Sequence, residues 1–140
     1  MKDSLNWRRN KETETDMQIY IGAALLIVVI ILSILLICGL PLGELSMGGK
    51  YKVWPGKLRL LAVSQLLSQI FALYILLSAG GIAPVFISIK AVKITCIVFA
   101  VFFAGNTVMN FISPSKKEKY IMTPMSLIEA VCFAVTAFRI

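Results

Sequence analysis

Polar and apolar positions are sharply segregated along this chain. No charged residue occurs from position 17 to 43, from 60 to 89 or from 94 to 115, and Glu129 is the one charge from 120 to 138. An apolar run of about 18 or more residues with few charges is long enough to cross the hydrocarbon of a bilayer as a helix. The pattern therefore predicts four membrane spans, at about 18–40, 57–79, 92–112 and 121–138.

Proline and glycine mark the ends of these runs. Pro41 follows the first run, Gly80 and Gly81 follow the second, and Thr123 and Pro124 precede the fourth. Strands cross a membrane only as a closed barrel, so four isolated apolar segments must be helices. We expect an all-α integral membrane protein, with a polar N-terminal tail over residues 1–17 and one domain over 18–140. That domain would be a bundle of four transmembrane helices.

The first span could also be the core of a cleaved signal peptide. Its apolar stretch is longer than the usual 7 to 15 residues of such a core, and no small-x-small cleavage site follows it. We therefore expect the first span to be retained as a membrane anchor.

Composition and charge agree with this class. Hydrophobic residues make up 59% of the chain and charged residues 15%, against roughly 25% charged in an ordinary soluble domain. The net charge of +7 would suit nucleic acid, but the basic residues cluster at the ends of the spans, where they face anionic lipid headgroups. We expect the lipid bilayer and its anionic headgroups as partners, and no nucleic acid. The headgroup-facing residues would be Lys50, Lys52, Lys57, Arg59, Lys116, Lys117 and Lys119.

The segment 43–59, GELSMGGKYKVWPGKLR, raises the question of a phosphate-binding loop because it contains GGK at 48–50. Such a loop needs Ser or Thr after the lysine and lies between a strand and a helix. Here Tyr51 follows the lysine, and the segment joins two membrane spans. We interpret it as a headgroup-facing loop, with Tyr51 and Trp54 in the interfacial aromatic belt.

Lysine and arginine counts do not settle the orientation. Seven lie in the N-terminal tail, the second loop and the C-terminus, and seven in the first and third loops. The basic clusters of the first and third loops lie directly against the spans, whereas those of the tail are interspersed with acids. On that ground we predict a cell-membrane protein with both termini outside and loops 41–57 and 113–123 in the cytoplasm.

Two loops carry a resemblance to a known group of proteins. The first is PLGELSMGGKYKVWPGKLRL at 41–60, which is basic and rich in glycine. The second is MNFISPSKKEKYIMTPMSLIEA at 109–130, which contains Asn110, Ser113, Ser115, Lys116, Lys117 and then Thr123 and Pro124. This pairing, over residues 40–138, resembles small, poorly characterised four-span membrane proteins of Gram-positive bacteria. The resemblance implies a bacterial multi-pass architecture and no particular activity.

Residues for catalysis or metal binding are scarce. The chain has no histidine, the commonest general base and metal ligand. Cys38, Cys96 and Cys132 lie in different apolar spans, without the paired spacing of a zinc site. We interpret these cysteines as packing residues, and we expect no metal, no cofactor and no enzymatic activity.

Polar side chains inside the spans form the candidate binding site. Gln65 and Gln69 in the second span are four residues apart and share a helix face, as do Asn106 and Asn110 in the third. Glu129 stands alone in the fourth span. A charged residue near the bilayer centre costs a few kcal/mol and is a functional hypothesis by default, with the four amides as its expected neighbours. Interhelical glue is the alternative for the amides, and for Glu129 both interpretations stay open.

Small residues four positions apart predict helix–helix contacts. Ala100 and Ala104 form such a pair in the third span, and Ala130 and Ala134 in the fourth. The first span has no polar stripe beyond Ser33, so we predict that it is the most lipid-exposed helix.

Two classes of function fit these features. The first is a non-enzymatic accessory or interaction bundle that binds another membrane protein, lipid or itself as a homo-oligomer. The second is a small transporter or lipophile-binding protein that uses the polar cluster around Glu129. Four helices are few for a transport path, so the second class requires a dimer or larger assembly.

The predicted orientation can be tested with single cysteines in a cysteine-free background. Cysteine at Ser46 or Ser115 should react with an impermeant thiol reagent only after the cell is opened. Labelling of both positions in intact cells would reverse the orientation, and labelling of one alone would change the number of spans.

Overall fold

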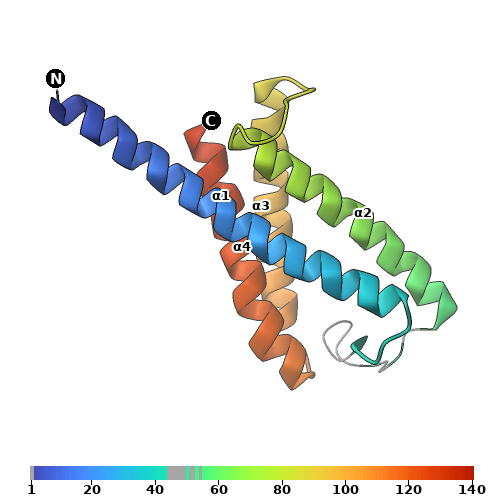
Figure 1. Ribbon diagram of the computed structural model, residues 1–140. Helices are drawn as coiled ribbons and strands as arrows, with labels where there is room; N and C mark the ends of the chain where they lie inside the picture. The colour runs from blue at the N-terminus through green and yellow to red at the C-terminus, as the bar shows by residue number, and fades with distance from the viewer. Residues whose placement is uncertain (1, 44–49, 51–52, 54) are drawn as a thin grey trace.

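The structure is a computed structural model in which four long helices form one bundle (Figure 1). It describes residues 2–43, 50, 53 and 55–140 and, within 3–16, the backbone alone. The helices are α1 (Lys2–Ile37), α2 (Gly56–Ala79), α3 (Ile89–Phe111) and α4 (Thr123–Arg139), and η3 (Glu118–Met122) is a π-helical turn that leads into α4. The predicted all-helical, four-span architecture is confirmed.

Helix α1 is longer than the first predicted span. It begins at Lys2 and runs through the polar N-terminal segment without a break. That segment contains no glycine or proline, so no residue in it strongly opposes a helix. The part that is long and apolar enough to cross a membrane is Met17–Ile37, and the polar part projects beyond the bundle (Figure 1).

Glycine sets the ends of α1 and α2. Gly39 and Gly81 have φ angles of 93° and 74°, a left-handed conformation that glycine adopts without a steric penalty. The N–H of Gly39 donates to the Leu36 carbonyl, and that of Gly81 to the Ser78 carbonyl, each at 3.1 Å. These bonds satisfy carbonyl groups that the last helical turn leaves unpaired. The first span therefore ends at Ile37, shortly before position 40, where it was predicted to end.

Helices α3 and α4 begin in different ways. Ser88 caps α3, because its hydroxyl group accepts a hydrogen bond from the Ala91 N–H at 3.1 Å, and the helix starts at Ile89, ahead of the predicted Val92. Pro124 has no N–H to donate to the carbonyl group four residues before it. The wider π turn of η3 lies directly before α4. Such a turn lets a helix continue past a missing bond, so the fourth span begins a few residues earlier than predicted.

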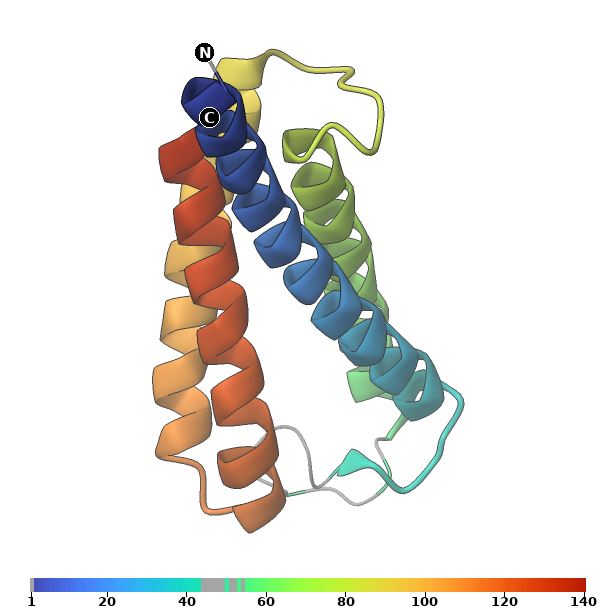
Figure 2. The same ribbon diagram turned by 60° about the vertical axis from the view of Figure 1, so that its left-hand side comes forward.

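The chain folds into two antiparallel hairpins, α1–α2 and α3–α4 (Figure 2). Helix α3 packs most extensively on α4, and α1 on α2, whereas α1 with α4 makes the main contact between the hairpins. Both termini and the α2–α3 loop lie at one end of the bundle, here called the terminal end. The first and third loops lie at the other, the loop end. In both views the hairpins meet toward the terminal end and diverge toward the loop end.

The main hydrophobic core lies where the hairpins meet. Phe133 of α4 is fully buried, and its ring centroid lies 5.4 Å from that of Phe99 and 5.5 Å from that of Phe103. Helices α1 and α2 add Ile19, Ala23, Leu26, Ala72, Ile75 and Leu76. A smaller cluster around Leu36 and Ala62 lies nearer the loop end and is built from α1, α2 and the first loop. Apolar packing between the hairpins is therefore concentrated toward the terminal end.

Two packing predictions are wrong. Ala104 is exposed, whereas Ala130 is buried and Ala100 and Ala134 are half-buried, so the contact stripe of α3 does not continue to Ala104. The first span is also not the most lipid-exposed, because 33% of it is buried against 22% for α2 and 17% for α3. The physical reason is that α1 packs on both α2 and α4.

Gly22 permits a close approach of three helices. A β-carbon at this position would lie 2.8 Å from Cδ2 of Leu76 and 3.3 Å from Cβ of Cys132. Gly22→Leu should therefore lower the free energy of unfolding by about 1–3 kcal/mol through overpacking. The matched control is Gly105→Leu, since nothing lies within 4 Å of its β-carbon position. Circular dichroism during unfolding in mixed micelles measures both, and equal destabilisation would contradict this packing.

Candidate functional site

The inward faces of α2, α3 and α4 are apolar along part of the bundle and polar along another part. Inward residues recur at alternating intervals of three and four, the spacing of a packed helix face. They are Leu58, Ala62, Gln65, Gln69, Ala72 and Leu76 on α2, Val92, Cys96, Phe99, Phe103, Asn106 and Asn110 on α3, and Met122, Ser126, Glu129, Phe133 and Thr136 on α4. Apart from Thr136, the polar members lie on the loop side of the aromatic core. With Ser33 of α1 they form what we call the polar belt: Ser33, Gln65, Gln69, Asn106, Asn110, Ser126 and Glu129.

Glu129 is the most enclosed member of the polar belt. Its side chain is 1% exposed, and neither carboxyl oxygen has a hydrogen-bond partner among the described residues. It lies one turn from Cys132, which packs beside Gly22 where α1 meets α4. Its carboxyl group is thus enclosed by protein and not by lipid. Burying a polar group without a hydrogen bond is unfavourable, which makes this position unusual.

Two of the predicted amides join neighbouring helices. Oε1 of Gln69 accepts a hydrogen bond from the Ser33 hydroxyl group at 2.9 Å, which links α2 to α1. Nδ2 of Asn110 donates to the Ser126 hydroxyl group at 3.1 Å, which links α3 to α4. Each bond lies within one hairpin, as expected of interhelical glue, and neither reaches Glu129. A binding role for these residues stays a prediction.

The other two amides have no such bond. Gln65 lies on the inward face of α2 but is exposed, because the α3–α4 hairpin diverges from α2 at this level (Figures 1 and 2). Asn106 is half-buried on α3. In the part of the chain that the structure describes, neither side-chain amide makes a hydrogen bond. The structure therefore does not bring Gln65 or Asn106 into a hydrogen bond with Glu129.

A groove of about 80 Å³ opens beside Gln65, between the two hairpins. We call it the hairpin groove. It is lined by Val29, Leu32, Ser33, Leu36, Leu42, Gln65, Gln69 and Met122. Glu129 is not among these residues and lies about two turns beyond Met122 along the helix. Ser33 could have been suspected as the one polar residue deep in the first span, but no pattern in the sequence marks Leu42 or Met122.

The bond between Gln18 and Thr136 also escaped the sequence analysis. Nε2 of Gln18 donates to the Thr136 hydroxyl group at 3.2 Å and ties α1 to α4 near the terminal end. The available signal was spacing, because Thr136 follows Glu129 by seven residues and therefore shares its helix face. This bond holds the two hairpins together where they converge.

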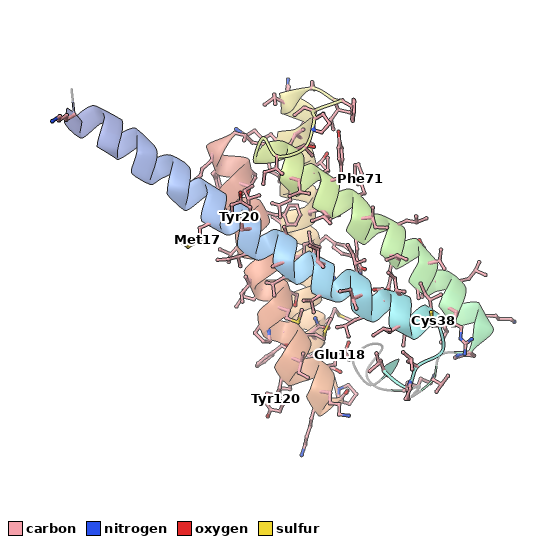
Figure 3. The ribbon with its side chains drawn as sticks, viewed as in Figure 1. Met17, Tyr20, Cys38, Phe71, Glu118 and Tyr120 are labelled. Carbon is pink, nitrogen blue, oxygen red and sulfur yellow. The ribbon has the colours of Figure 1, made fainter. Side chains whose placement is uncertain are left out.

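Basic side chains gather at the loop end, which Cys38 and Glu118 mark in Figure 3. Of the residues predicted to face headgroups, Lys50, Lys57, Lys116 and Lys117 are exposed. The guanidinium group of Arg59 lies beside Gly39 at the end of α1, and Nζ of Lys119 lies 5.1 Å from the centroid of the Phe111 ring. Lys52 falls outside the described residues. We call these described basic residues the basic rim.

Glu118 has a structural role that the sequence analysis did not single out. Its backbone N–H donates to the Ser115 hydroxyl group at 3.4 Å, and its carboxylate accepts a hydrogen bond from the Ser113 hydroxyl group. Ser115 and Glu118 have the S-x-x-E spacing of a capping box, so the signal was present. These bonds fix the start of the helix that carries Lys116, Lys117 and Lys119.

Four helices that are long and apolar enough to span a bilayer, packed as a bundle, define a multi-pass membrane protein. A scan against protein-family models and searches of curated proteins and of solved structures find no match. The resemblance to four-span proteins of Gram-positive bacteria thus stays a prediction from two loops.

The environment of Glu129 predicts how substitutions should behave. Because its carboxyl group has no hydrogen-bond partner among the described residues, Glu129→Leu should leave the free energy of unfolding unchanged or raise it. Ser126→Ala removes the hydroxyl group that accepts from Asn110 and should lower the free energy of unfolding by about 1 kcal/mol. Thermal unfolding in detergent micelles measures both. A loss above about 2 kcal/mol for Glu129→Leu would show that the carboxyl group is bonded.

Proposed function

We propose that this chain is a non-enzymatic interaction protein that binds a membrane component in the hairpin groove. The component would be lipid, another membrane protein or a second copy of the chain. The observation that supports this is Gln65, an inward-facing residue whose amide lines an open groove and makes no hydrogen bond with a described residue. An amide without a partner is unfavourable in hydrocarbon, so a bound component with a polar group would stabilise this face.

The positions of the two acids with described side chains support a role without catalysis. The carboxylate of Glu118 accepts a hydrogen bond from the Ser113 hydroxyl group beside the start of its own helix. Glu129 follows it by eleven residues, roughly 16 Å along a helix, so the two carboxyl groups are too far apart to act as an acid–base pair. The sequence also has no histidine to pair with either. We propose no cofactor for this protein.

A small transporter built around Glu129 is the second candidate. The observation that favours it is the buried carboxyl group, since ionisable residues inside a membrane often mark ion or substrate paths. The hairpin groove, however, is not lined by Glu129, and the aromatic core fills the bundle beyond it. A path would require a second copy of the chain. Binding is therefore the function that the geometry supports best.

We infer a bacterial cell membrane as the location, with both termini outside and loops 41–57 and 113–123 in the cytoplasm. The supporting observation is that the two loops lie at the same end of the bundle, so that their basic residues, the basic rim, gather on one side of the membrane. Lysine and arginine beside the spans favour the cytoplasmic side. The resemblance carried by the two loops supports the bacterial source.

Purification from the native membrane in a mild detergent tests the binding function. Native mass spectrometry of the wild-type chain should show bound lipid, protein or a second copy, and Gln65→Leu should reduce the bound fraction because it removes the amide from the groove. The control Ser64→Leu alters an exposed polar residue of the same helix outside the groove. A bare wild-type monomer, or the same loss in both variants, would refute the proposal.

A further inference from the structure

We propose that the hairpin groove binds one anionic phospholipid from the leaflet at the loop end, with a short stretch of one acyl chain in the groove and the phosphate group at the basic rim. This inference rests on the binding function proposed above and names the class of its ligand. Three features carry it: the walls of the groove, its width, and the basic rim at the same end of the bundle.

The walls of the groove suit an acyl chain that has a polar group above it. Five lining residues are aliphatic or thioether side chains: Val29, Leu32, Leu36, Leu42 and Met122. Of the three polar lining residues, Ser33 and Gln69 bond to each other. In that bond Gln69 is the acceptor through Oε1, so its amide N–H groups and the whole side-chain amide of Gln65 make no hydrogen bond with a described residue. The ester carbonyl groups of a phospholipid, which lie next to its phosphate, are acceptors for such N–H groups.

The size of the groove separates a lipid chain from a protein helix. An α-helix with its side chains is about 10–12 Å across, and it could not enter a space of about 80 Å³ unless the hairpins moved further apart. An acyl chain is narrower than a helix, so a short stretch of it, a few methylene groups, can occupy the groove with the hairpins where they are, while the rest of that chain stays in the bilayer. The second acyl chain of the phospholipid would remain in the bilayer. The geometry therefore favours a phospholipid over a transmembrane helix.

The basic rim lies at the same end of the bundle as Leu36, Leu42 and Met122, which line the groove. Leu36 and Leu42 line the groove and pack with Leu58, the residue between Lys57 and Arg59. Arg59 precedes Gln65 by six residues, about 9 Å along the helix. Among the charged residues described at this end, one is acidic: Glu118, whose carboxylate accepts a hydrogen bond from Ser113. The other six are those of the basic rim, Lys50, Lys57, Arg59, Lys116, Lys117 and Lys119. A phosphate group at this end of the groove would lie within reach of Arg59. Gln65 would lie below that phosphate group, toward the bilayer centre.

The experiment titrates the purified full-length chain with phosphatidylglycerol and phosphatidylcholine of identical acyl chains, read by native mass spectrometry. One phosphatidylglycerol should bind more tightly than phosphatidylcholine. The double variant Lys57→Gln/Lys116→Gln should weaken phosphatidylglycerol binding about fivefold per charge removed. Leu32→Phe narrows the groove and should weaken binding of both lipids. Circular dichroism confirms that each variant is folded.

Two controls match these variants. Lys90→Gln/Lys93→Gln removes the same charge from the terminal end, and Val101→Phe adds the same bulk to an outward face of α3, where Val101 is 69% exposed. Both should leave the affinity for phosphatidylglycerol unchanged.

A second measurement needs no variant and therefore tests the lipid proposal even if Leu32→Phe does not fold. Phosphatidylglycerol that carries a photoreactive diazirine on one acyl chain should label the segment 29–36 and Met122 of the wild-type chain. Equal affinity for the two lipids, equal loss in the control variants, or labels confined to outward faces would overturn the lipid proposal. A second copy or a protein found in the groove would overturn it while the binding function stands, and an empty groove would overturn both.

Discussion

Hydrocarbon offers no hydrogen-bond partners, and that constraint governs how this bundle is held together. Every polar side chain inside the four spans must find its partner within the chain, in a bound component or in water. Three side-chain bonds meet this demand and also define the helix pairs: Ser33 with Gln69, Asn110 with Ser126, and Gln18 with Thr136. The first two each close a hairpin. The third joins one hairpin to the other.

The divergence of the hairpins follows from where these bonds and the apolar contacts lie. Phe133 packs on Phe99 and Phe103, and the Gln18–Thr136 bond lies still closer to the terminal end. Nearer the loop end, the inward positions carry amides and a serine that are satisfied within one hairpin or not at all. The hydrophobic cluster of described residues nearest the loop end is built from α1, α2 and the first loop, so it does not join the two hairpins. The groove is therefore a consequence of which residues face inward.

The sequence predicted the four spans well because charge and apolar run length are properties of contiguous residues. It predicted helix faces well too, since spacing alone puts Gln65 with Gln69 and Asn106 with Asn110. It could not predict how far the neighbouring helix lies from each face. Gln69 meets Ser33 while Gln65, one turn away on the same face, meets an open groove. Glu129 shows the same limit: the four amides were expected as its neighbours, but whether any of them bonds to its carboxyl group depends on distances between helices. Spacing likewise failed at Ala104, which turns away from the contact that Ala100 makes.

The basic rim links the orientation of the chain to its groove. Lysine and arginine beside the spans favour the cytoplasmic side, and the cytoplasmic leaflet is also where anionic lipids attract such residues, by about 1 kcal/mol each. Lys57 and Arg59 begin α2, and Lys116 and Lys117 begin the helix that leads into α4. Gln65 and Met122, which line the groove, lie further along the same two helical segments. The residues that would hold the loop end in the cytoplasm are thus the ones placed to meet a lipid phosphate. Inverting the chain would carry the groove into the other leaflet, so orientation and ligand cannot vary independently.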